Sequence, residues 1–567
     1  MNIQRHYMKP IGNLFWAICT LLSLQTTAQT KNAFYIQFNS KGTQFRASEN
    51  LSQAAIDRRM KYAISYDSTD YPVNQDYIST ILKDTNISFR YSLKWHNAIV
   101  VESDLETLEQ VRTHSFVKKV AFVGKTLPKQ TSNEIPFTTP TLKLKESEIT
   151  TLNLTPENYG VAYDQNKQIG VIELHQNGFD GNNVKVAVFD AGFFNIHKLP
   201  SFIKQQGNGL LTYAYDVVDL DVTMNDKDNH GTAVSSCIAA YDINKYVGSA
   251  PNASLFLFRT ENAISEYPLE ELNWCKAAEL ADSAGMDLIT SSLGYNQYDD
   301  ASLSYTWNDL NGRTSYVSLA AKLAVDKGIF VLNSAGNEGD KKWRKIGTPA
   351  DVPAVLTIGA VDVKDRIGSF SSQGYNAEGK VKPDVCALGV KASVASTYGS
   401  YYQGYGTSYA TPIAAGGVAC LLQAFPNVRP KQVAQIIRET ASQGSTPDSL
   451  MGYGIARLNL AYEVLKQREL ENTTPYLMRT DKNEIVIFTS QNATIDYELF
   501  SKRSFLWIFK RKAQLASGQF QTNGAIGIIN ISELNIKCSK KYTLKVELSG
   551  NVENLTLKYN DLSLCSD

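Results

Sequence analysis

The chain has 567 residues, of which 43% are hydrophobic and 20% charged, and its 56 Lys and Arg residues are balanced by 56 Asp and Glu residues. This is an ordinary globular composition, and the length suggests about three or four domains. Because the net charge is zero and no basic run is longer than the KRK at 510–512, the sequence argues against a nucleic-acid partner.

Residues 1–28 have the pattern of a secretory signal peptide. The basic residues Arg5 and Lys9 precede the apolar run IGNLFWAICTLLSL, and the small residues TTA follow at 26–28. This order is typical of a cleaved export signal, and the apolar run is too short for a good membrane span. We expect cleavage near Ala28, a secreted or extracytoplasmic protein, and no membrane span after signal removal.

Residues 29–124 are predicted to form a small α/β domain from their apolar periodicity. Residues 125–158 are rich in Thr, Pro, Lys and Glu without a sustained period, which predicts an exposed linker. The expected strands of the small domain are 34–38, 87–93, 97–103 and 117–123, and the expected helices are 51–60, 76–83 and 104–112.

Residues 159–468 alternate nearly continuous apolar strands with helices such as 316–328. This pattern indicates an α/β domain whose mostly parallel sheet is covered on both faces, in three layers. Binding groups in such sheets collect at the carboxyl ends of the strands. The expected strands are 184–190, 254–260, 287–292, 329–336 and 354–361.

Residues 469–567 change to short alternating strands separated by turns, which predicts a C-terminal β-sandwich domain. Its fold does not indicate its role. Cys538 and Cys565 lie in this region, and their pairing stays open. Cys237, Cys275, Cys386 and Cys420 have apolar neighbours, as expected of free core cysteines.

Four polar motifs fall at predicted strand ends or helix starts: Asp190 in VAVFDAG, His230 in DNHGTAV, Asn337 in NSAGNEGD and Ser408 in GTSYATP. Each residue has an ordinary interpretation as a turn or helix-cap residue. Ser408 precedes a helix of small apolar residues, and Pro412 suits the first turn if Ser408 lies at or near the N-cap. Ser408 would then lie at the positive end of a buried helix, where negative charge is stabilised.

Together, these motifs resemble those of the subtilisin-like serine proteases, the subtilases. DAG, HGT, SSLG, SAGNEG and GTSYATP occur in that family's order, with the catalytic residues running Asp, His, Ser. The resemblance implies that His230 takes the proton of Ser408, that Asp190 orients the imidazole, and that an acyl-enzyme forms. It also implies an oxyanion hole made by the Asn337 side chain and the Ser408 backbone N–H.

The resemblance assigns substrate-binding residues as well. Ser292, Leu293 and Gly294 are expected to pair with the substrate backbone as an added strand and to line the S1 pocket. Gly336 and Glu338 are expected to form the opposite wall with Asn337. Tyr409 stands where many subtilases carry methionine, which leaves rate and substrate choice open.

Residues 29–124 resemble the subtilase propeptide, a ferredoxin-like domain that assists folding and inhibits the enzyme. A large parallel sheet has many non-local contacts and folds slowly, so a removable folding aid is physically reasonable. We expect self-cleavage within residues 125–158. The alternative is a permanent accessory domain.

The function expected from the resemblance is that of an exported serine endopeptidase acting on proteins or peptides without a required cofactor. The alternative is an inactive relative that binds proteins or glycans, and a sedolisin-type acid protease is disfavoured because His230 stands in HGT. No residues show the spacing of a metal site. The Asp- and Asn-rich segment 216–229 could hold a structural calcium ion, although a solvated loop is the favoured interpretation.

Overall fold

The computed structural model places most of the N-terminal and central parts of the chain and the backbone of several C-terminal strands. The predicted signal segment, most of the predicted linker, Cys538 and Cys565 fall outside the described residues. The structure describes residues 31–41, 51–126, 152–222 and 228–469, and strands between 476 and 548.

A seven-stranded sheet forms the centre of the chain, in the order β13-β12-β11-β10-β5-β9-β6, and every neighbouring pair is parallel. This confirms the parallel sheet predicted from the apolar runs. Six of the strands are mostly or wholly buried, as strands covered on both faces must be, and the edge strand β6 is only partly buried. The strands are β5 (Lys185–Asp190), β6 (Leu211–Asp216), β9 (Ser254–Arg259), β10 (Leu288–Ser291), β11 (Phe330–Ser334), β12 (Leu356–Val361) and β13 (Val385–Leu388).

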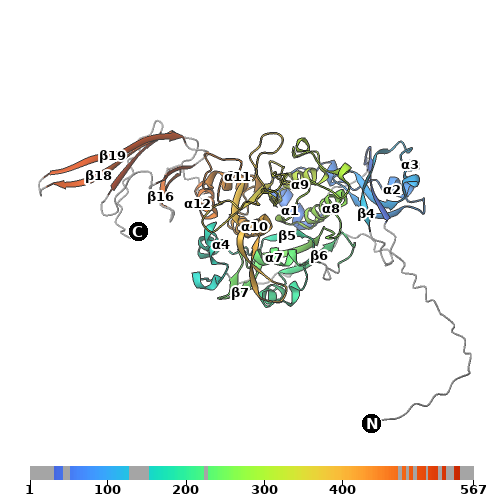
Figure 1. Ribbon diagram of the computed structural model, residues 1–567, viewed down its shortest axis with the longest axis horizontal. Coiled ribbons are helices and arrows are strands. Elements are labelled where there is room, and N and C mark those ends of the chain that lie inside the picture. The colour runs from blue at the N-terminus through green and yellow to red at the C-terminus, as the bar shows by residue number, and fades with distance from the viewer. Residues whose placement is uncertain are drawn as a thin grey trace, which may run out of the picture.

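Helices cover both faces of this sheet (Figure 1). Along β5, Val186 and Val188 pack in the core that contains α7 and α10, whereas Ala187 and Phe189 pack with α8 and α9. This alternation gives the predicted three layers. The helices of the first face are α4 (Tyr163–Gln168), α5 (Val171–Gln176), α7 (His230–Ala239), α10 (Thr407–Ala424), α11 (Pro430–Thr440) and α12 (Leu458–Glu469), and those of the second are α8 (Pro268–Ala284) and α9 (Tyr316–Asp326).

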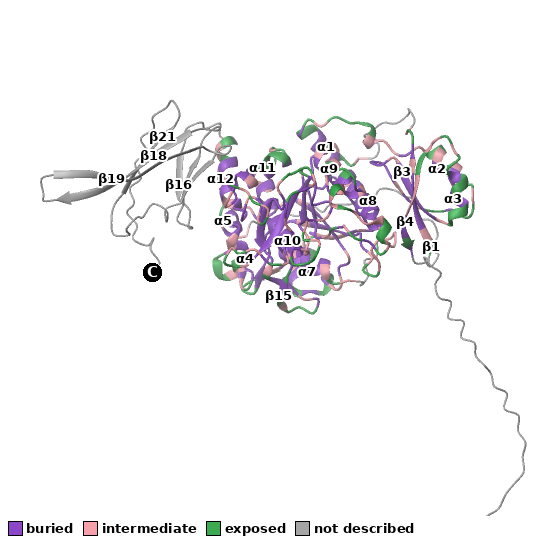
Figure 2. Cartoon of the chain, turned by 45° about the horizontal axis from the view of Figure 1, so that its top comes forward, coloured by how far each residue is buried: buried purple, intermediate pink, exposed green. Residues whose placement is uncertain are grey.

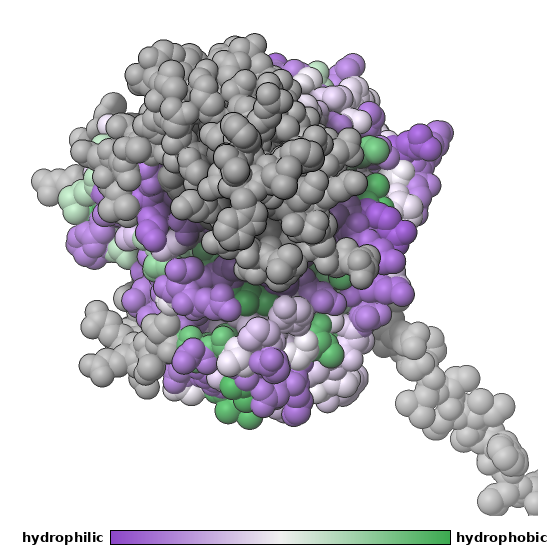
Figure 3. All heavy atoms as spheres, turned by 90° about the vertical axis from the view of Figure 1, so that its left-hand side faces the viewer, coloured by the Kyte–Doolittle hydropathy of each residue, from purple (hydrophilic) through white to green (hydrophobic). Residues whose placement is uncertain are grey.

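The buried elements concentrate in this central domain, as the purple colouring of Figure 2 shows. Helix α10 is buried along almost its whole length. Its glycines allow close packing, since a methyl group on Gly417 would lie 2.2 Å from Leu458 Cδ1. Hydrophobic and hydrophilic side chains intermingle on the part of the described surface that Figure 3 shows.

The N-terminal domain has a four-stranded antiparallel sheet in the order β2-β3-β1-β4. Helices α2 and α3 pack on one face, around Phe34, Ile36 and Leu108, which gives the predicted ferredoxin-like fold. The elements are β1 (Lys31–Phe38), α1 (Gln53–Lys61), α2 (Gln75–Ile81), β2 (Ser88–Leu93), β3 (Ala98–Ser103), α3 (Leu105–Val111) and β4 (Val117–Thr126).

The opposite face of this small sheet packs on the central domain (Figure 1). Tyr35, Tyr91 and Leu93 join the core of α8 and α9. Helix α1 packs on α8, and its Arg58 and Arg59 both bind the carboxylate of Asp282. The sequence predicts α1 as a helix of the small domain but does not indicate that it reaches across to its neighbour.

The C-terminal strands form two three-stranded antiparallel sheets, β16-β17-β20 and β19-β18-β21. They are consistent with the predicted β-sandwich. None of the helices in the described ranges is long and apolar enough to cross a membrane. The strands are β16 (Tyr476–Arg479), β17 (Glu484–Phe488), β18 (Thr494–Phe505), β19 (Phe509–Gln521), β20 (Ile526–Asn530) and β21 (Tyr542–Leu548).

Candidate active site

Asp190 and His230 meet at the carboxyl edge of the central sheet. Asp190 is the last residue of β5, and His230 is the first residue of α7. The Nδ1 atom of His230 lies 2.8 Å from Asp190 Oδ1 and 3.0 Å from Oδ2. Asp190 is fully buried, and its Oδ1 also accepts a hydrogen bond from the Ala191 N–H at 2.8 Å. These contacts fix the orientation of the ring and leave Nε2 for other partners.

The charge of Asp190 also sets the ionisation of the ring. Burial disfavours the imidazolium, but the charge and hydrogen bond of Asp190, with a smaller contribution from Asp228, outweigh burial and raise the pKa of His230 above 6.5. The backbone N–H of His230 donates to Asp228 Oδ1 at 2.7 Å, which holds the start of the helix. A buried carboxylate beside an imidazole is suited to stabilising a transient imidazolium.

Ser408 lies in the first turn of α10, whose N-cap is Gly406 and whose first residue is Thr407. Pro412 lies further along, inside the helix, so its predicted place in the first turn is wrong. A residue at this position would normally donate its N–H to the carbonyl of Ser408, which proline cannot do. The Oγ of Ser292 donates to that carbonyl instead, at 2.9 Å, and Ser408 Oγ donates to the Ser292 carbonyl at 3.4 Å.

Asn337 and the Ser408 backbone present two donors to one small space. Asn337 Oδ1 accepts hydrogen bonds from Thr407 N at 3.0 Å and Thr407 Oγ1 at 3.1 Å, so the amide Nδ2 is left to donate elsewhere. A methyl group built on Gly406 would lie 3.7 Å from Asn337 Nδ2 and 3.6 Å from the Ser408 nitrogen. The two donors therefore border the same position, as an oxyanion hole requires.

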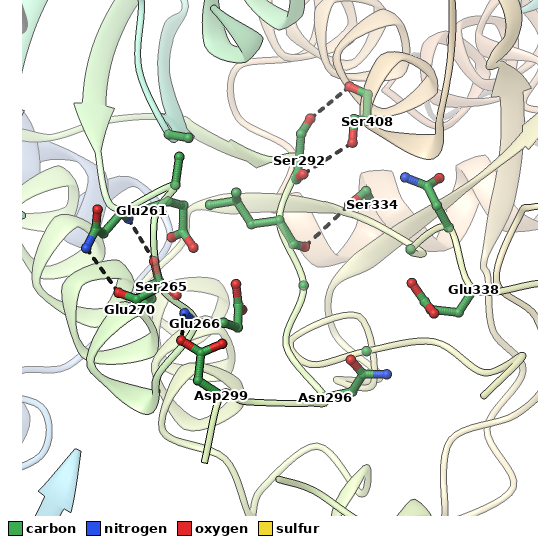
Figure 4. Close-up of a pocket in the computed structure, with 18 of the residues that line it drawn as sticks. Glu261, Ser265, Glu266, Glu270, Ser292, Asn296, Asp299, Ser334, Glu338 and Ser408 are labelled. Atoms are coloured by element: carbon green, nitrogen blue, oxygen red, sulfur yellow. Dashed lines mark hydrogen bonds between the residues drawn. The ribbon is translucent and has the colours of Figure 1, made fainter. Parts of the chain in front are cut away.

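A cavity of about 560 Å³ opens beside Ser408 and Asn337. One wall is made by Ser292, Leu293 and Gly294, and the other includes Gly336 and Glu338. Asn333 Nδ2 holds the first wall in place by donating to the Leu293 carbonyl at 2.8 Å. All the substrate-binding residues predicted from the sequence thus line one cavity with the candidate nucleophile (Figure 4).

The same cavity has an acidic end that the sequence prediction misses. Glu261, Glu266, Glu270 and Asp299 line it, on the side away from Ser408 in Figure 4. We refer to these four residues as the acidic cluster. One signal was present in the sequence, because Glu261 comes two residues after the end of β9, at the same edge of the sheet as Asp190.

The segment considered for calcium uses its described carboxylates in other ways. Asp216 and Asp219 both bind Arg259 Nη1, each at 2.8 Å. In the described ranges, no group of three or more His, Cys, Asp or Glu side chains is arranged to hold a metal ion. Of the other histidines in this domain, His175 is buried beside Tyr159, and His197 contacts Tyr213.

Comparison with known proteins gives the class to which this fold and site belong. Residues 181–454 match the subtilase family, peptidase S8, and residues 33–136 match the peptidase S8 propeptide domain of Bacteroidota. The chain therefore belongs to the subtilase family of serine proteases, and its N-terminal domain is a propeptide domain of that family. This confirms the resemblance seen in the motifs.

Individual relatives support the same assignment. Subtilisin of Bacillus pumilus is 31% identical over 293 residues, which are 50% of this chain and 91% of the relative. Subtilisin E of Bacillus subtilis is also 31% identical, over 50% of this chain, and the match spans 66% of its own length. The membrane-bound transcription factor site-1 protease of Mus musculus is 29% identical over 308 residues, 52% of this chain and 26% of the relative.

Proposed function

We propose that the protein is an exported serine endopeptidase that cleaves peptide bonds of proteins through an acyl-enzyme. The observation that carries the proposal is the buried Asp190 bound to His230, at the sheet edge where Ser408 faces a substrate-sized cavity. The Asp190–His230 contact favours an enzyme over an inactive binding protein, because titratable groups with perturbed pKa values cluster at catalytic sites.

In the acylation step, Ser408 Oγ attacks the carbonyl carbon of the scissile bond and His230 Nε2 accepts its proton. The oxyanion receives hydrogen bonds from the Ser408 N–H and Asn337 Nδ2, and the loss of one such donor in subtilisin costs roughly 10²–10³ in kcat. The C–N bond then breaks as His230 gives the proton to the leaving amine. Water attacks the ester in the same manner, which releases the new carboxyl group and restores Ser408.

Ser292, Leu293 and Gly294 bind the substrate backbone by adding it as a strand, and the side chain before the scissile bond enters the space between this wall and Glu338. This pairing gives affinity with little sequence preference. The reaction itself uses no cofactor, and the calcium suggested for segment 216–229 would be structural.

The N-terminal domain inhibits the enzyme until its linker is cut. Its last strand, β4, ends at Thr126, and Lys125 and Thr126 line a second cavity with Ala263 and Ile264, which also border the first. The chain thus leaves the propeptide domain next to the substrate cleft. We place self-cleavage within residues 125–158. The intact mass of the secreted, active protein tests this, because an N-terminus kept at Gln29 would indicate a permanent domain instead.

The nucleophile is tested by labelling the purified secreted protein with a fluorophosphonate. We expect the wild-type protein to be labelled and to hydrolyse casein, and Ser408→Ala to lose both properties. Ser400→Ala is the control, since Ser400 is an exposed serine in the turn between β14 (Val390–Ala395) and β15 (Tyr401–Tyr405). Equal labelling of the wild-type protein and Ser408→Ala would reject the assignment.

A further inference from the structure

The acidic cluster gathers four carboxyl groups without a balancing cation. Glu261, Glu266, Glu270 and Asp299 line one end of the substrate cavity, and none of them forms an ion pair with a described Lys, Arg or His. The lysine of the cavity lining, Lys341, is bound to Glu338 at 2.9 Å on the other wall. The end of the cavity away from Ser408 is therefore negative wherever these groups are ionised (Figure 4).

Glu270 provides a second, independent indication of a ligand. Its side chain is 4% exposed, and its Oε1 accepts a hydrogen bond from the Asn262 N–H at 2.7 Å. Its Oε2 is buried and has no hydrogen-bond partner. A buried acceptor without a partner is costly and rare in folded proteins. A hydrogen-bond donor from a bound molecule would remove this cost.

The neighbouring carboxyl groups are held in place around it. Glu261 Oε1 accepts hydrogen bonds from Tyr295 Oη at 2.7 Å and from Thr260 Oγ1 at 2.8 Å. Asp299 Oδ2 accepts from the Glu266 N–H at 3.2 Å. Burial and then the neighbouring carboxyl groups raise the pKa of Glu270 to about 10 and that of Glu266 to about 7. Glu270 is therefore protonated at neutral pH in the empty site, and a guanidinium bound beside it would lower its pKa and restore the carboxylate as an acceptor.

A metal ion does not fit this arrangement, because no described group of three His, Cys, Asp or Glu side chains is close enough to share one. A guanidinium group has five N–H donors in a planar fork and can contact separated carboxylates at once. An ammonium group has three donors and a shorter reach across such a site. The spread of acceptors in the acidic cluster therefore favours arginine over lysine.

The position of the acidic cluster indicates which part of a bound substrate would supply the arginine side chain. Residues 261–266 line the same cavity as Ser292, Leu293 and Gly294. On the proposed function, on which this step rests, a substrate strand lies along that wall with its residue before the scissile bond beside Ser408. The acidic cluster lies on the side of this cavity away from Ser408, where the residues further towards the substrate N-terminus would continue.

We propose that the acidic cluster is a specificity site for a basic side chain, preferably arginine, located upstream of the residue that enters the S1 pocket. The enzyme thereby selects protein segments that carry a positive charge on the amino-terminal side of the cleaved bond.

Matched fluorogenic peptides test this with the secreted, processed protein. One series places arginine, lysine, citrulline or alanine in turn at the second, third and fourth residues before the scissile bond. Citrulline keeps the shape of arginine and removes its charge. We expect kcat/KM for arginine to exceed that for citrulline by about 10- to 100-fold at one position, as charge-assisted hydrogen bonds to buried carboxylates would give. Equal rates at all three positions would overturn the proposal.

Variants connect the preference to the cluster. We expect Glu270→Gln to reduce the arginine preference, the ratio of kcat/KM for the arginine peptide to that for the citrulline peptide, to about threefold or less. Glu266→Gln, at a less buried site, gives a second variant if Glu270→Gln fails to fold. The control is Glu378→Gln, whose carboxylate binds Arg313 and does not line the cavity. An undiminished preference in both cluster variants would reject the site.

The outcome that contradicts the proposed function can be distinguished from the one that contradicts the specificity site. If no peptide is hydrolysed, that function is wrong, and calorimetric titration of the same protein with the arginine and citrulline peptides then tests the site alone. Tighter binding of the arginine peptide supports it, and equal affinities reject it.

Discussion

Arg59 of the propeptide domain and Asp282 of helix α8 form an ion pair that is buried from solvent, with Arg59 Nη2 2.9 Å from Asp282 Oδ2. Arg59 also binds Asp70 at 3.1 Å, and Lys327 binds Asp70 at 2.9 Å. Burial alone would raise the pKa of Asp282, but Arg58, Lys94 and Arg59 outweigh it and hold the pKa below 3.8. The interface between the two domains thus contains buried ion pairs, and each buried charge is stabilised by its partners.

Removal of one partner should destabilise the unprocessed chain. In a Ser408→Ala background, which should keep the linker uncut, we expect Arg59→Met to lower the free energy of unfolding by up to about 3–5 kcal/mol, because the buried carboxylates of Asp282 and Asp70 each lose one of their cationic partners. Urea denaturation measures the change. The exposed Arg112–Glu109 pair of the same domain supplies the control, since Arg112→Met should have little effect. Equal effects of the two substitutions would contradict a structural role for the buried pair.

The Asp190–His230 contact predicts the pH dependence of hydrolysis. Because His230 accepts a proton only as the neutral imidazole, kcat/KM should rise with pH with a midpoint above 6.5. In Asp190→Asn the cause of the raised pKa is gone while burial remains, so the midpoint should move lower and kcat should fall by about 10⁴. Rates measured from pH 5 to 9 test both, and an unchanged midpoint in the variant would contradict the assignment.

The raised pKa of His230 also makes the stability of the folded chain depend on pH, in the direction opposite to activity. Because the pKa of His230 is raised in the folded chain, its protonation stabilises the folded state at pH values below about 6.5, its ordinary value. This contribution is lost as the pH rises through the higher folded pKa. Activity and this part of the stability therefore change in opposite directions over the same interval.

Tyr409 packs between the histidine and the strand before α10. Its ring centroid lies 6.0 Å from that of His230, and a methyl group on Gly404 would lie 2.4 Å from the tyrosine ring. We expect Tyr409→Met to leave Asp190, His230 and Ser408 in place and to lose activity faster in hydrogen peroxide, since a thioether next to Ser408 oxidises readily. Residual activity against time of exposure measures this. Equal inactivation rates of variant and wild type would mean that the position is protected from the oxidant.

Ser292→Ala tests the hydrogen bond from Ser292 Oγ to the Ser408 carbonyl, which replaces the helical hydrogen bond that Pro412 cannot donate. The variant leaves the buried carbonyl of Ser408 without its donor, so we expect a loss of about 1–3 kcal/mol in the free energy of unfolding. Labelling by a fluorophosphonate should also slow by about tenfold, because the first turn of α10 loses its support. Ser400→Ala again serves as the control. An unchanged stability would show that another group satisfies the carbonyl.

Some of these features are readable from the sequence and others are not. The strands of the central sheet follow from continuous apolar runs, and DAG, HGT and GTSYATP predict which side chains lie at its edge. The position of Pro412 is mispredicted because a local pattern cannot show that Ser292, 116 residues away, supplies the missing donor. The acidic cluster escapes prediction for the same reason, since only the fold brings Asp299 beside Glu266.

The proline inside α10 has a consequence for how substrate and nucleophile influence each other. Because Pro412 has no N–H, Ser292 Oγ directly supports the first turn of α10, so on the proposed function the wall that binds the peptide also holds the turn that carries Ser408. A peptide that draws residues 292–294 towards itself also pulls on that turn. On the proposed function, substrate affinity and the orientation of Ser408 Oγ therefore depend on the same contact, and a weakly bound peptide should also be acylated slowly.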